Sequence, residues 1–224
     1  MQTRLNKFLA TRLAIGRRAA DELIAAGKVL RNGVAAKMGE RVEQNDRIEV
    51  NGKILSASAP VFLYVLMNKP AGYVCSRRQQ GDTPTIYSLL PQKYQHLKTV
   101  GRLDKDSSGV ILLTNDGDYT QELTHPKYTK IKKYEVRLKE PLQPLHHQMI
   151  NDFGVDLPDG KSKLLLEGSG KEWLVTMHEG RNRQIRRTFG ALGYDVARLH
   201  RLQFGKYTTS DISPGKPFGE VSKK

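Results

Sequence analysis

Four aspartates surround one apolar run in the segment GRLDKDSSGVILLTNDGD, which spans residues 101–118. Asp104 and Asp106 precede the run, and Asp116 and Asp118 follow it. Carboxylates in such positions can bind a metal ion, form turns, or act as a nucleophile or a base. Because most of the chain is basic, an acidic cluster at one point marks a candidate site.

Metal binding is the first interpretation of this cluster. The spacing from Asp104 to Gly109 matches the opening of a calcium-binding EF-hand loop, but the position that should carry a bidentate glutamate is Asn115. Residues 110–113 between them form a strand-like apolar run instead of a ligand loop. A magnesium site at either aspartate pair is an alternative, although no third acidic or histidine cluster follows. The sequence therefore predicts no metal site.

Turn formation accounts for three of the four aspartates. Asp116 lies in an Asn-Asp-Gly turn at the end of the apolar run, and Asp118 can cap the helix that follows. Asp106, followed by two serines and a glycine, suits a tight loop. These three residues are therefore interpreted as structural.

Asp104 is the aspartate that could perform chemistry. It lies two residues after Arg102, on the loop that leads into a predicted strand at 110–114. A neighbouring guanidinium favours the ionised form of a carboxylate, and an ionised carboxylate can act as a nucleophile or a base. The spacing alone does not choose between this role and that of another turn residue.

The charge of the chain indicates an anionic partner. Its 224 residues include 37 Lys and Arg against 23 Asp and Glu, a formal net charge of +14. Such an excess is typical of proteins that bind nucleic acid, because cations that neutralise phosphates release counterions. A basic enzyme of another kind is the alternative. Cys75 is the only cysteine, which excludes an intrachain disulfide and a cysteine-based zinc site and fits a reducing compartment.

The start of the chain carries charges every few residues and lacks the apolar core of a secretory signal. No stretch approaches the roughly 20 apolar residues that a membrane helix needs. We therefore expect a soluble, cytoplasmic protein.

Residues 4–27 repeat apolar side chains three or four positions apart, as in two packed helices. Gly16 separates the two runs, and Gly27 ends the second as a helix C-cap would. Asn32 and Gly33 then form a hairpin-turn signal between two short β-type runs.

This order of two helices and a β-rich turn resembles the S4 RNA-binding module. The matching residues are RLNKFLATRLAIGRRAADELIAAGKVLRNG and the later DRIEV, within about residues 3–50. The family usually has Asp where this chain has Asn6, and Ser where it has Gly16. A solvated helix face explains any single basic residue here. The resemblance nevertheless implies RNA-binding residues, which we expect to be Arg4, Lys7, Arg17, Arg18, Lys28 and Asn32.

Residues 56–61 are small or polar and lose the periodicity, so we expect a linker between one domain at 1–55 and another at 62–224. The second domain intersperses strands and helices without a regular alternation, which predicts an α+β fold with a mixed, mainly antiparallel sheet. The predicted strands are at 110–114, 133–138 and 172–177, and the predicted helices are at 118–124, 142–151 and 182–192.

Four separate motifs resemble those of the pseudouridine synthases, in the branch named for the small-subunit ribosomal enzyme RsuA. The first is the aspartate-containing segment at 101–118. The others are LMNKPAGYVCS at 66–76, KIKKYEV at 130–136 and EGRNRQIRRTFGALGYDVARLHR at 179–201. That branch pairs an N-terminal S4 module with its catalytic domain, which is the order expected here.

The resemblance implies that the protein isomerises a uridine of ribosomal RNA to pseudouridine without a cofactor or a metal. Asp104 matches the catalytic carboxylate, which attacks C1′ or removes the 2′ proton, and Arg186 matches the basic residue that pairs with it. Tyr134 matches the tyrosine that stacks on the flipped uracil, and Leu199 matches an apolar residue that closes over the base. From the residues alone, Tyr134 and Leu199 are also explained as core side chains.

Basic and amide side chains near these motifs are expected to hold the RNA around an extruded uridine. The alternative for the arginines of the 183–187 segment is a basic helix face that touches phosphate. The residues expected to contact RNA are Arg102, Arg181, Asn182, Arg183, Gln184 and Arg187.

Two other functions compete with this one. A non-catalytic RNA-binding or ribosome-assembly factor would lack a functional active site. The presence of Asp104, Tyr134 and Arg186 argues against this alternative. A metal-dependent RNase or phosphodiesterase would lose activity on chelation. NKPAGYVCS favours a small-subunit (16S) target and GRNRQIRR a large-subunit (23S) target, and we expect the former. The expected partner is ribosomal RNA or a subunit assembly intermediate, bound by a monomer.

Overall fold

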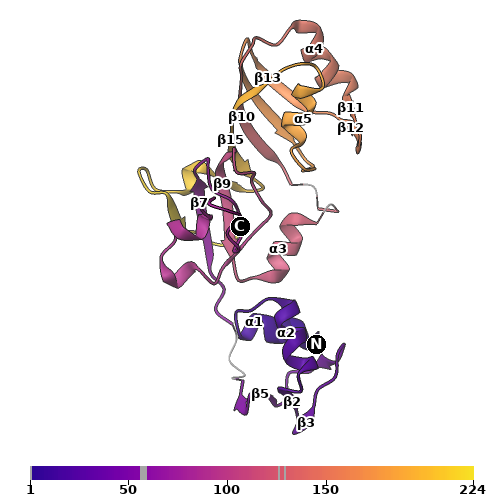
Figure 1. Ribbon diagram of the computed structural model, residues 1–224, viewed down its shortest axis with the longest axis vertical. Coiled ribbons are helices and arrows are strands. Elements are labelled where there is room, and N and C mark those ends of the chain that lie inside the picture. The colour runs from indigo at the N-terminus through magenta and orange to yellow at the C-terminus, as the bar shows by residue number, and fades with distance from the viewer. Residues whose placement is uncertain (1, 56–59, 126, 129) are drawn as a thin grey trace. The chain divides into compact units, whose positions relative to one another are not determined.

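The computed structural model divides into two compact units (Figure 1). The first contains Met1–Leu63 and Asn115–Gly117, and the second contains Tyr64–Thr114 and Asp118–Lys224. The structure describes residues 2–55, 60–125, 127–128 and 130–224. Residues 56–59, most of the expected linker, therefore lie outside the described residues.

The first unit consists of two helices and short strands. Leu5, Leu9 and Ile24 of the helices are buried in one core with Val29 and Ile48 of the strands, as the apolar periodicity predicted. Strands β3, β2, β5 and β6 form an antiparallel sheet in that order, and β1 pairs with β4. The elements are β1 (Thr3–Arg4), α1 (Leu5–Arg12), α2 (Arg17–Ala25), β2 (Val29–Arg31), β3 (Val34–Ala35), β4 (Arg41–Val42), β5 (Ile48–Val50) and β6 (Lys53–Ile54).

Two predicted turns are present in this unit. Gly27 follows α2 with a φ of 67°, and the Lys28 amide donates a hydrogen bond of 3.0 Å to the carbonyl oxygen of Leu23, which ends the helix. Asn32 and Gly33 join β2 to β3 with φ values of 53° and 83°. Both central residues thus have the positive φ that a type I′ hairpin requires.

A nine-stranded sheet forms the centre of the second unit. Its main path runs β13, β14, β10, β15, β9, β7, β17, with β16 paired to β15 and β8 to β9. Neighbouring strands are antiparallel except β9 and β15, which are parallel. This mixed sheet confirms the predicted α+β class. The strands are β7 (Tyr64–Lys69), β8 (Lys98–Thr99), β9 (Ser108–Thr114), β10 (Lys132–Leu138), β13 (Leu165–Ser169), β14 (Glu172–Met177), β15 (Val196–Phe204), β16 (Tyr207–Thr208) and β17 (Phe218–Glu220).

Helices and a small hairpin cover parts of this sheet, and α5 packs beside β15 and β11 (Figure 1). The three predicted helices are present, with ends within about two residues of those expected; the middle one continues as a π-helical turn. These elements are α3 (Gly117–Thr124), α4 (Pro144–Gln148), the π-helical turn (Met149–Phe153), β11 (Val155–Leu157), β12 (Gly160–Ser162) and α5 (Gln184–Gly190), with single 3₁₀ turns at Ile86–Leu89, Gln92–Tyr94 and Thr209–Asp211.

One aspartate of the opening segment differs from its predicted role. Because α3 begins at Gly117, Asp118 lies in the first turn and not at the cap, and Asp116 is the residue that precedes the helix. A carboxylate in the first turn still interacts favourably with the positive end of the helix dipole. Asp118 therefore keeps a structural role, at a different position from the expected one.

The backbones of β9 and β15 approach most closely at Gly109, which is paired with Arg201. Gly109 has a φ of 110°, and a Cβ atom there would lie 2.2 Å from the carbonyl oxygen of Arg201. Only glycine permits this approach. Since the loop that contains Asp104 leads directly into β9, this contact sets the position of Asp104 relative to β15.

Candidate active site

A cleft of about 320 Å³ brings together three of the four expected catalytic residues, Asp104, Tyr134 and Leu199. The side chain of Asp104 is 33% exposed, whereas Tyr134 and Leu199 are nearly buried in the wall. The cleft thus offers one accessible carboxylate beside an aromatic and an aliphatic surface. Its volume is at the lower end of the range for small-ligand sites, which suits a ligand of nucleoside size.

Strand pairing in the middle of the sheet assembles this cleft. Tyr134 of β10 lies opposite Arg201 of β15, and Arg201 lies opposite Gly109 of β9. Leu199 comes two residues before Arg201 and so faces the same side of β15. Asp104 is on the loop that immediately precedes β9. These residues come from three segments that are distant in sequence, namely the Asp104 loop with β9, β10 and β15, and the pairing of the strands makes them neighbours.

Lys69, the last residue of β7, holds the loop that carries Asp104. Lys69 is fully buried, and its Nζ donates hydrogen bonds to the carbonyl oxygens of Pro70 (3.0 Å), Asp104 (3.1 Å) and Ser107 (2.6 Å). Burial lowers the pKa of Lys69, and the three carbonyls satisfy its three donors. Sequence reasoning gave Lys69 no role; a lysine at the end of an apolar strand, directly before a proline, was the available signal.

Arg183 forms an ion pair with the carboxylate of Asp104, with 3.8 Å between its Nη1 and Oδ2 of Asp104. The same guanidinium donates two hydrogen bonds to Asp106, of 3.0 and 2.9 Å. Although burial of Asp106 opposes its charge, the hydrogen bond from Arg183 and the charges of Arg186 and Arg183 outweigh it and lower the pKa of Asp106. One arginine therefore neutralises Asp106 and also lies beside Asp104.

The position of Arg186 differs from the expected pairing with Asp104. Its Nε forms an ion pair of 3.1 Å with Asp106, its Nη2 donates to the carbonyl oxygen of Asp106 (3.0 Å), and its Nη1 donates to the carbonyl oxygen of Val196 (2.8 Å). These contacts bind Arg186 to Asp106, two residues after Asp104. Asp106, interpreted above as a turn residue only, is thus the carboxylate on which both arginines converge.

Arg183 adopts an uncommon backbone conformation. It is the residue before α5 and has a φ of 47° and a ψ of 30°, in the left-handed region. Residues other than glycine rarely adopt this region, and such strain is concentrated at functional sites. Here the left-handed turn accompanies the contact of the Arg183 side chain with the Asp104 loop.

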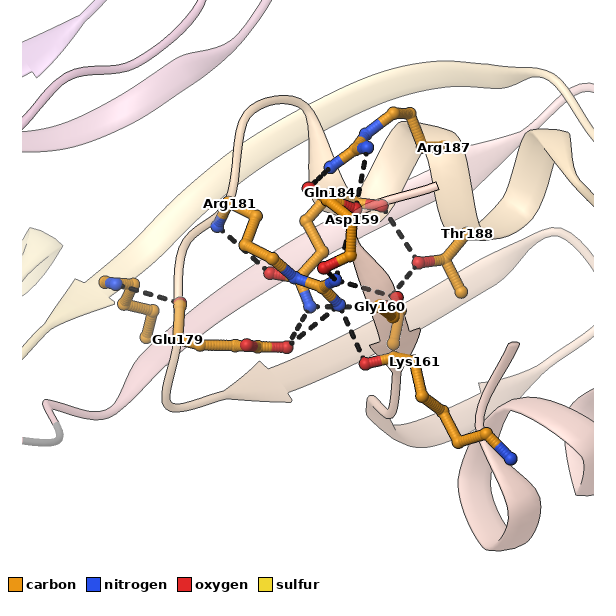
Figure 2. Close-up of polar contacts among 10 residues, drawn as sticks. Asp159, Gly160, Lys161, Glu179, Arg181, Gln184, Arg187 and Thr188 are labelled. Atoms are coloured by element: carbon orange, nitrogen blue, oxygen red, sulfur yellow. Dashed lines mark hydrogen bonds and ion pairs between the residues drawn. The ribbon is translucent and has the colours of Figure 1, made fainter. Parts of the chain in front are cut away.

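A network of polar side chains behind the cleft joins Arg181, Arg187 and Asp159 (Figure 2). Arg187 forms two hydrogen bonds with the Asp159 carboxylate, of 2.9 and 2.7 Å, and lowers its pKa. Arg181 donates to the carboxylate and carbonyl oxygens of Asp159 and to the carbonyl oxygens of Gly160 (2.8 Å) and Lys161 (2.9 Å). Both arginines, which we expected to contact RNA, use these donors to hold the β11–β12 turn.

Gln184 has a similar internal role. It is 3% exposed; its Oε1 accepts a hydrogen bond from the amide of Arg181 (3.1 Å), and its Nε2 donates to Ser162 Oγ (3.1 Å) and to the Glu179 carboxylate. Its amide group therefore bonds within the protein, although Gln184 also belongs to the lining of the cleft. Together with Arg181 and Arg187, it fixes the 179–184 loop that forms one side of the cleft.

Arg201 and Lys132 also line the cleft, and sequence reasoning assigned no site role to either. Arg201 is 3% exposed; its Nε donates to the carbonyl oxygen of Val110 (2.7 Å), and its guanidinium lies 4.9 Å from the centre of the Phe204 ring. Lys132 donates to the carbonyl oxygen of Glu179 (2.9 Å). Burial, and then the charge of Arg201, lower the pKa of Lys132. These two cations make the inner end of the cleft electropositive.

The other expected RNA contacts divide between the two units. Arg102 and Asn182 are exposed residues that line the cleft. In the first unit Arg4, Arg17, Arg18 and Lys28 are exposed, and Lys7 is half-buried.

Asn32 is exposed, and its side chain also has a role within its own hairpin. Its Nδ2 donates to Asp46 (2.7 Å), and its Oδ1 accepts from the Arg47 amide (2.9 Å). The side-chain amide therefore holds its own hairpin.

Within the part of the chain that the structure describes, no three or more His, Cys, Asp or Glu side chains are grouped so that they could hold a metal ion. None of the helices in the described ranges is long and apolar enough to cross a bilayer.

Residues 63–191 match the family described as RNA pseudouridylate synthase, and residues 3–48 match the S4 domain. The chain is 38% identical over 210 residues to ribosomal large subunit pseudouridine synthase B of Bacillus subtilis, covering 90% of this chain and 85% of that one. It is 35% identical over 221 residues to ribosomal small subunit pseudouridine synthase A of Vibrio cholerae, covering 95% and 94%. A crystal structure of a pseudouridylate synthase is similar at a TM-score of 0.68 and 31% identity, covering 98% and 96% of the two chains.

Proposed function

Since the chain belongs to the RNA pseudouridylate synthase family, we propose that it converts a uridine of ribosomal RNA to pseudouridine. The observation that carries this proposal is the meeting of Asp104, Tyr134 and Leu199 in one cleft, with an arginine 3.8 Å from the carboxylate. The relatives are named for both ribosomal subunits, so either rRNA contains candidate targets.

The reaction exchanges one bond between base and sugar for another. The N1–C1′ bond breaks, the uracil turns, and a C5–C1′ bond forms; C5 loses a proton and N1 gains one, so atoms and electrons balance without a second substrate. The protein must therefore assist departure of the base from C1′, retain the detached uracil, and exclude water that would add to C1′ instead.

Asp104 is suited to the first of these tasks. Its carboxylate opens into the cleft, 3.8 Å from the guanidinium of Arg183. An ionised carboxylate can add to C1′ or remove the 2′ proton, and both reactions start from the same place beside the ribose. Lys69 supports either one, because its hydrogen bonds hold the backbone of the Asp104 loop.

Tyr134 and Leu199 are suited to retaining the uracil. An aromatic ring provides a flat surface on which a base stacks, and an aliphatic side chain limits the space in which the base turns. Both residues are fixed by neighbouring strands, β10 and β15. A site on paired strands positions its groups more accurately than one on loops.

The revised arginine contacts divide the expected pairing role between two residues. In this proposal Arg183 stabilises the charge of Asp104 directly, whereas Arg186 acts through Asp106 and the backbone next to it. Arg186 is thus a positioning residue.

RNA binding completes the proposal. A uridine within folded RNA must leave its stack, at a cost of a few kcal/mol, and contacts with flanking phosphates offset that cost. Arg102 and Asn182 at the cleft, and Arg17 and Arg18 on the S4 unit, are exposed residues that suit such contacts. We propose a cytoplasmic monomer, acting where ribosomal subunits are assembled.

The experiment is a map of pseudouridines in both rRNAs from cells with and without the gene, repeated after complementation. Wild type and the control Asp152→Asn, an exposed carboxylate on the π-helical turn, restore one or more pseudouridines. Asp104→Asn restores none, although the purified variant binds the same RNA within a few-fold. Restoration by Asp104→Asn would contradict the catalytic role.

The cellular maps and an assay of the purified protein in EDTA separate the competing functions. A non-catalytic assembly factor would leave both maps identical with and without the gene. A metal-dependent nuclease would lose its activity in EDTA, whereas isomerisation by the carboxylate site continues there.

A further inference from the structure

A second and larger groove adjoins the cleft of Asp104. It has a volume of about 740 Å³ and lies between the end of α3, the start of β10 and the β12–β14 strands. It shares part of its lining with the cleft, including Lys132, Gly180 and Arg181. The two hollows are therefore continuous, and a chain that enters one can extend into the other.

The lining of this groove is strongly basic. Among the described residues of the lining, Glu179 is the one acidic residue, and Arg181 and Gln184 already bind that carboxylate. Lys130 forms an ion pair of 3.5 Å with Glu122, outside the lining. Lys161 is only weakly neutralised, because it lies 3.9 Å from Asp156 and is 59% exposed. The basic side chains of the lining are Lys130, Lys132, Lys161, Lys163 and Arg181.

Lys163 is the least neutralised of these cations. It is exposed between β12 and β13, and within the described residues no carboxylate lies within 4.0 Å of its ammonium. Lys161, two residues earlier, has its carbonyl oxygen bound by Arg181, while Figure 2 shows its ammonium pointing away from that network. The network thus fixes the backbone of this segment, while the side chains of Lys161 and Lys163 line the groove.

The groove also contains apolar surface that a base could cover. Leu164 and Met177 are buried beneath it, whereas Leu165 is 52% exposed and Tyr128 is 47% exposed. Exposed aromatic and aliphatic side chains beside unneutralised lysines form the combination that single-stranded RNA requires, because bases stack while phosphates bind cations.

We propose that this groove binds a nucleotide next to the target uridine in the same RNA strand. Lys161 and Lys163 contact its phosphate, and Tyr128 and Leu165 contact its base. The inference rests on the proposed function, because the continuity of the two hollows matters only if the cleft holds a nucleotide. An acidic protein segment would match the same lysines, but it is not joined covalently to the occupant of the cleft and does not use the exposed aromatic ring.

The test compares Lys163→Glu with Lys171→Glu, the same charge change on the exposed turn between β13 and β14 of the same sheet, outside the groove. Fluorescence anisotropy measures the binding of labelled nonauridylate and triuridylate to the full-length proteins. Lys163→Glu weakens nonauridylate binding about tenfold and reduces the slope of log affinity against log salt by about one. Lys171→Glu matches wild type, and triuridylate, short enough for the cleft alone, binds all three proteins equally.

Several outcomes would overturn the inference. Equal nonauridylate affinities of Lys163→Glu and wild type across the salt range exclude a phosphate contact, and an equal loss for triuridylate assigns the lysine to the cleft itself. Tighter binding of wild type to nonaglutamate than to nonauridylate assigns the groove to an acidic protein segment. Failure of the proposed function is a separate result, because it appears as unchanged rRNA pseudouridine maps whatever these affinities are.

Discussion

The ammonium of Lys69 donates a 3.1 Å hydrogen bond to the main-chain carbonyl oxygen of Asp104, from a fully buried position at the end of β7. A second bond of 2.6 Å reaches the carbonyl oxygen of Ser107. The two bonds clamp both ends of the four-residue turn that presents the Asp104 carboxylate. The geometry of the Asp104 turn thus depends on a buried ammonium group.

Lys69→Met should therefore lower the single-turnover rate much more than RNA affinity. Methionine has a similar shape but no donor, so the carbonyls lose their partners, which costs about 1–3 kcal/mol of stability for an unsatisfied buried group. Displacement of a reacting group by about 1 Å can cost about a hundredfold in rate. Rapid-quench kinetics and anisotropy measure the two effects. The control is Lys171→Met on an exposed turn, and a Lys69→Met rate equal to that of the control would refute the clamp.

Arg183→Ala and Arg183→Gly should both slow the reaction, but they should differ in stability. Each removes the cation 3.8 Å from Asp104, whereas only glycine relieves the left-handed backbone at φ 47°. We expect Arg183→Gly to be more stable than Arg183→Ala by about 1 kcal/mol. Urea unfolding of the two variants measures this difference. Equal midpoints would mean that the left-handed conformation is not retained in solution.

Gly109→Ala should destabilise the second unit strongly. A Cβ atom at this position would lie 2.2 Å from the Arg201 carbonyl oxygen, so β9 and β15 would have to separate. Such a backbone clash belongs to the mechanisms that cost more than about 4 kcal/mol. Gly219→Ala is the matched control, since nothing lies within 4 Å of a Cβ there. Calorimetry of both variants tests the difference, and similar unfolding temperatures would contradict the close approach.

Asp46 should make the stability of the first unit pH-dependent. Hydrogen bonds from the Glu43 amide, Arg31 and Asn32 lower the pKa of Asp46 to about 2, against about 3.9 in an unfolded chain. A depressed pKa contributes stability that is complete above the unfolded value and is lost as pH falls toward the folded one. Asp46→Asn should therefore lower the thermal midpoint at pH 7, by an amount that diminishes between about pH 4 and pH 2.

The control for this pH dependence is Glu22→Gln, an exposed carboxylate on α2 of the same unit. It should follow the wild-type profile of thermal midpoint against pH. If Asp46→Asn instead differs from wild type by the same amount at pH 7 and pH 2.5, the Asp46 carboxylate is not the titrating group.

Local patterns in the sequence predicted most of the elements. The helical period of residues 4–27, the turn at Asn32 and Gly33, and the apolar run at 110–114 each depend on neighbours within a few residues. The order of motifs also indicated the family and the loop position of Asp104. The predicted domain limits at 55 and 62 stay predictions, because most of the segment between them lies outside the described residues.

The contacts around Asp104 required the tertiary structure. Arg183 and Arg186 are three residues apart, and nothing local to them states which one reaches Asp104 and which one reaches Asp106. The expected RNA contacts of Arg181, Gln184 and Arg187 stay predictions, but their internal contacts also required the tertiary structure. The sequence does not show that the Asp159 turn binds Arg181 and Arg187, or that Ser162 and Glu179 bind Gln184.

The sequence by itself therefore determined the fold class and the local elements, since these follow from short-range periodicity and turn chemistry, and the order of its motifs led to the proposal of Asp104 as the reacting carboxylate. Only the tertiary structure decided which cations serve that carboxylate and which serve the framework. Lys69 and Asp104 are 35 residues apart along the chain, and the pairing of β7 with β9, in which Lys69 lies opposite Gly109, brings them together. Ion pairs depend on distances of a few ångströms, and long-range strand pairing alone sets those distances.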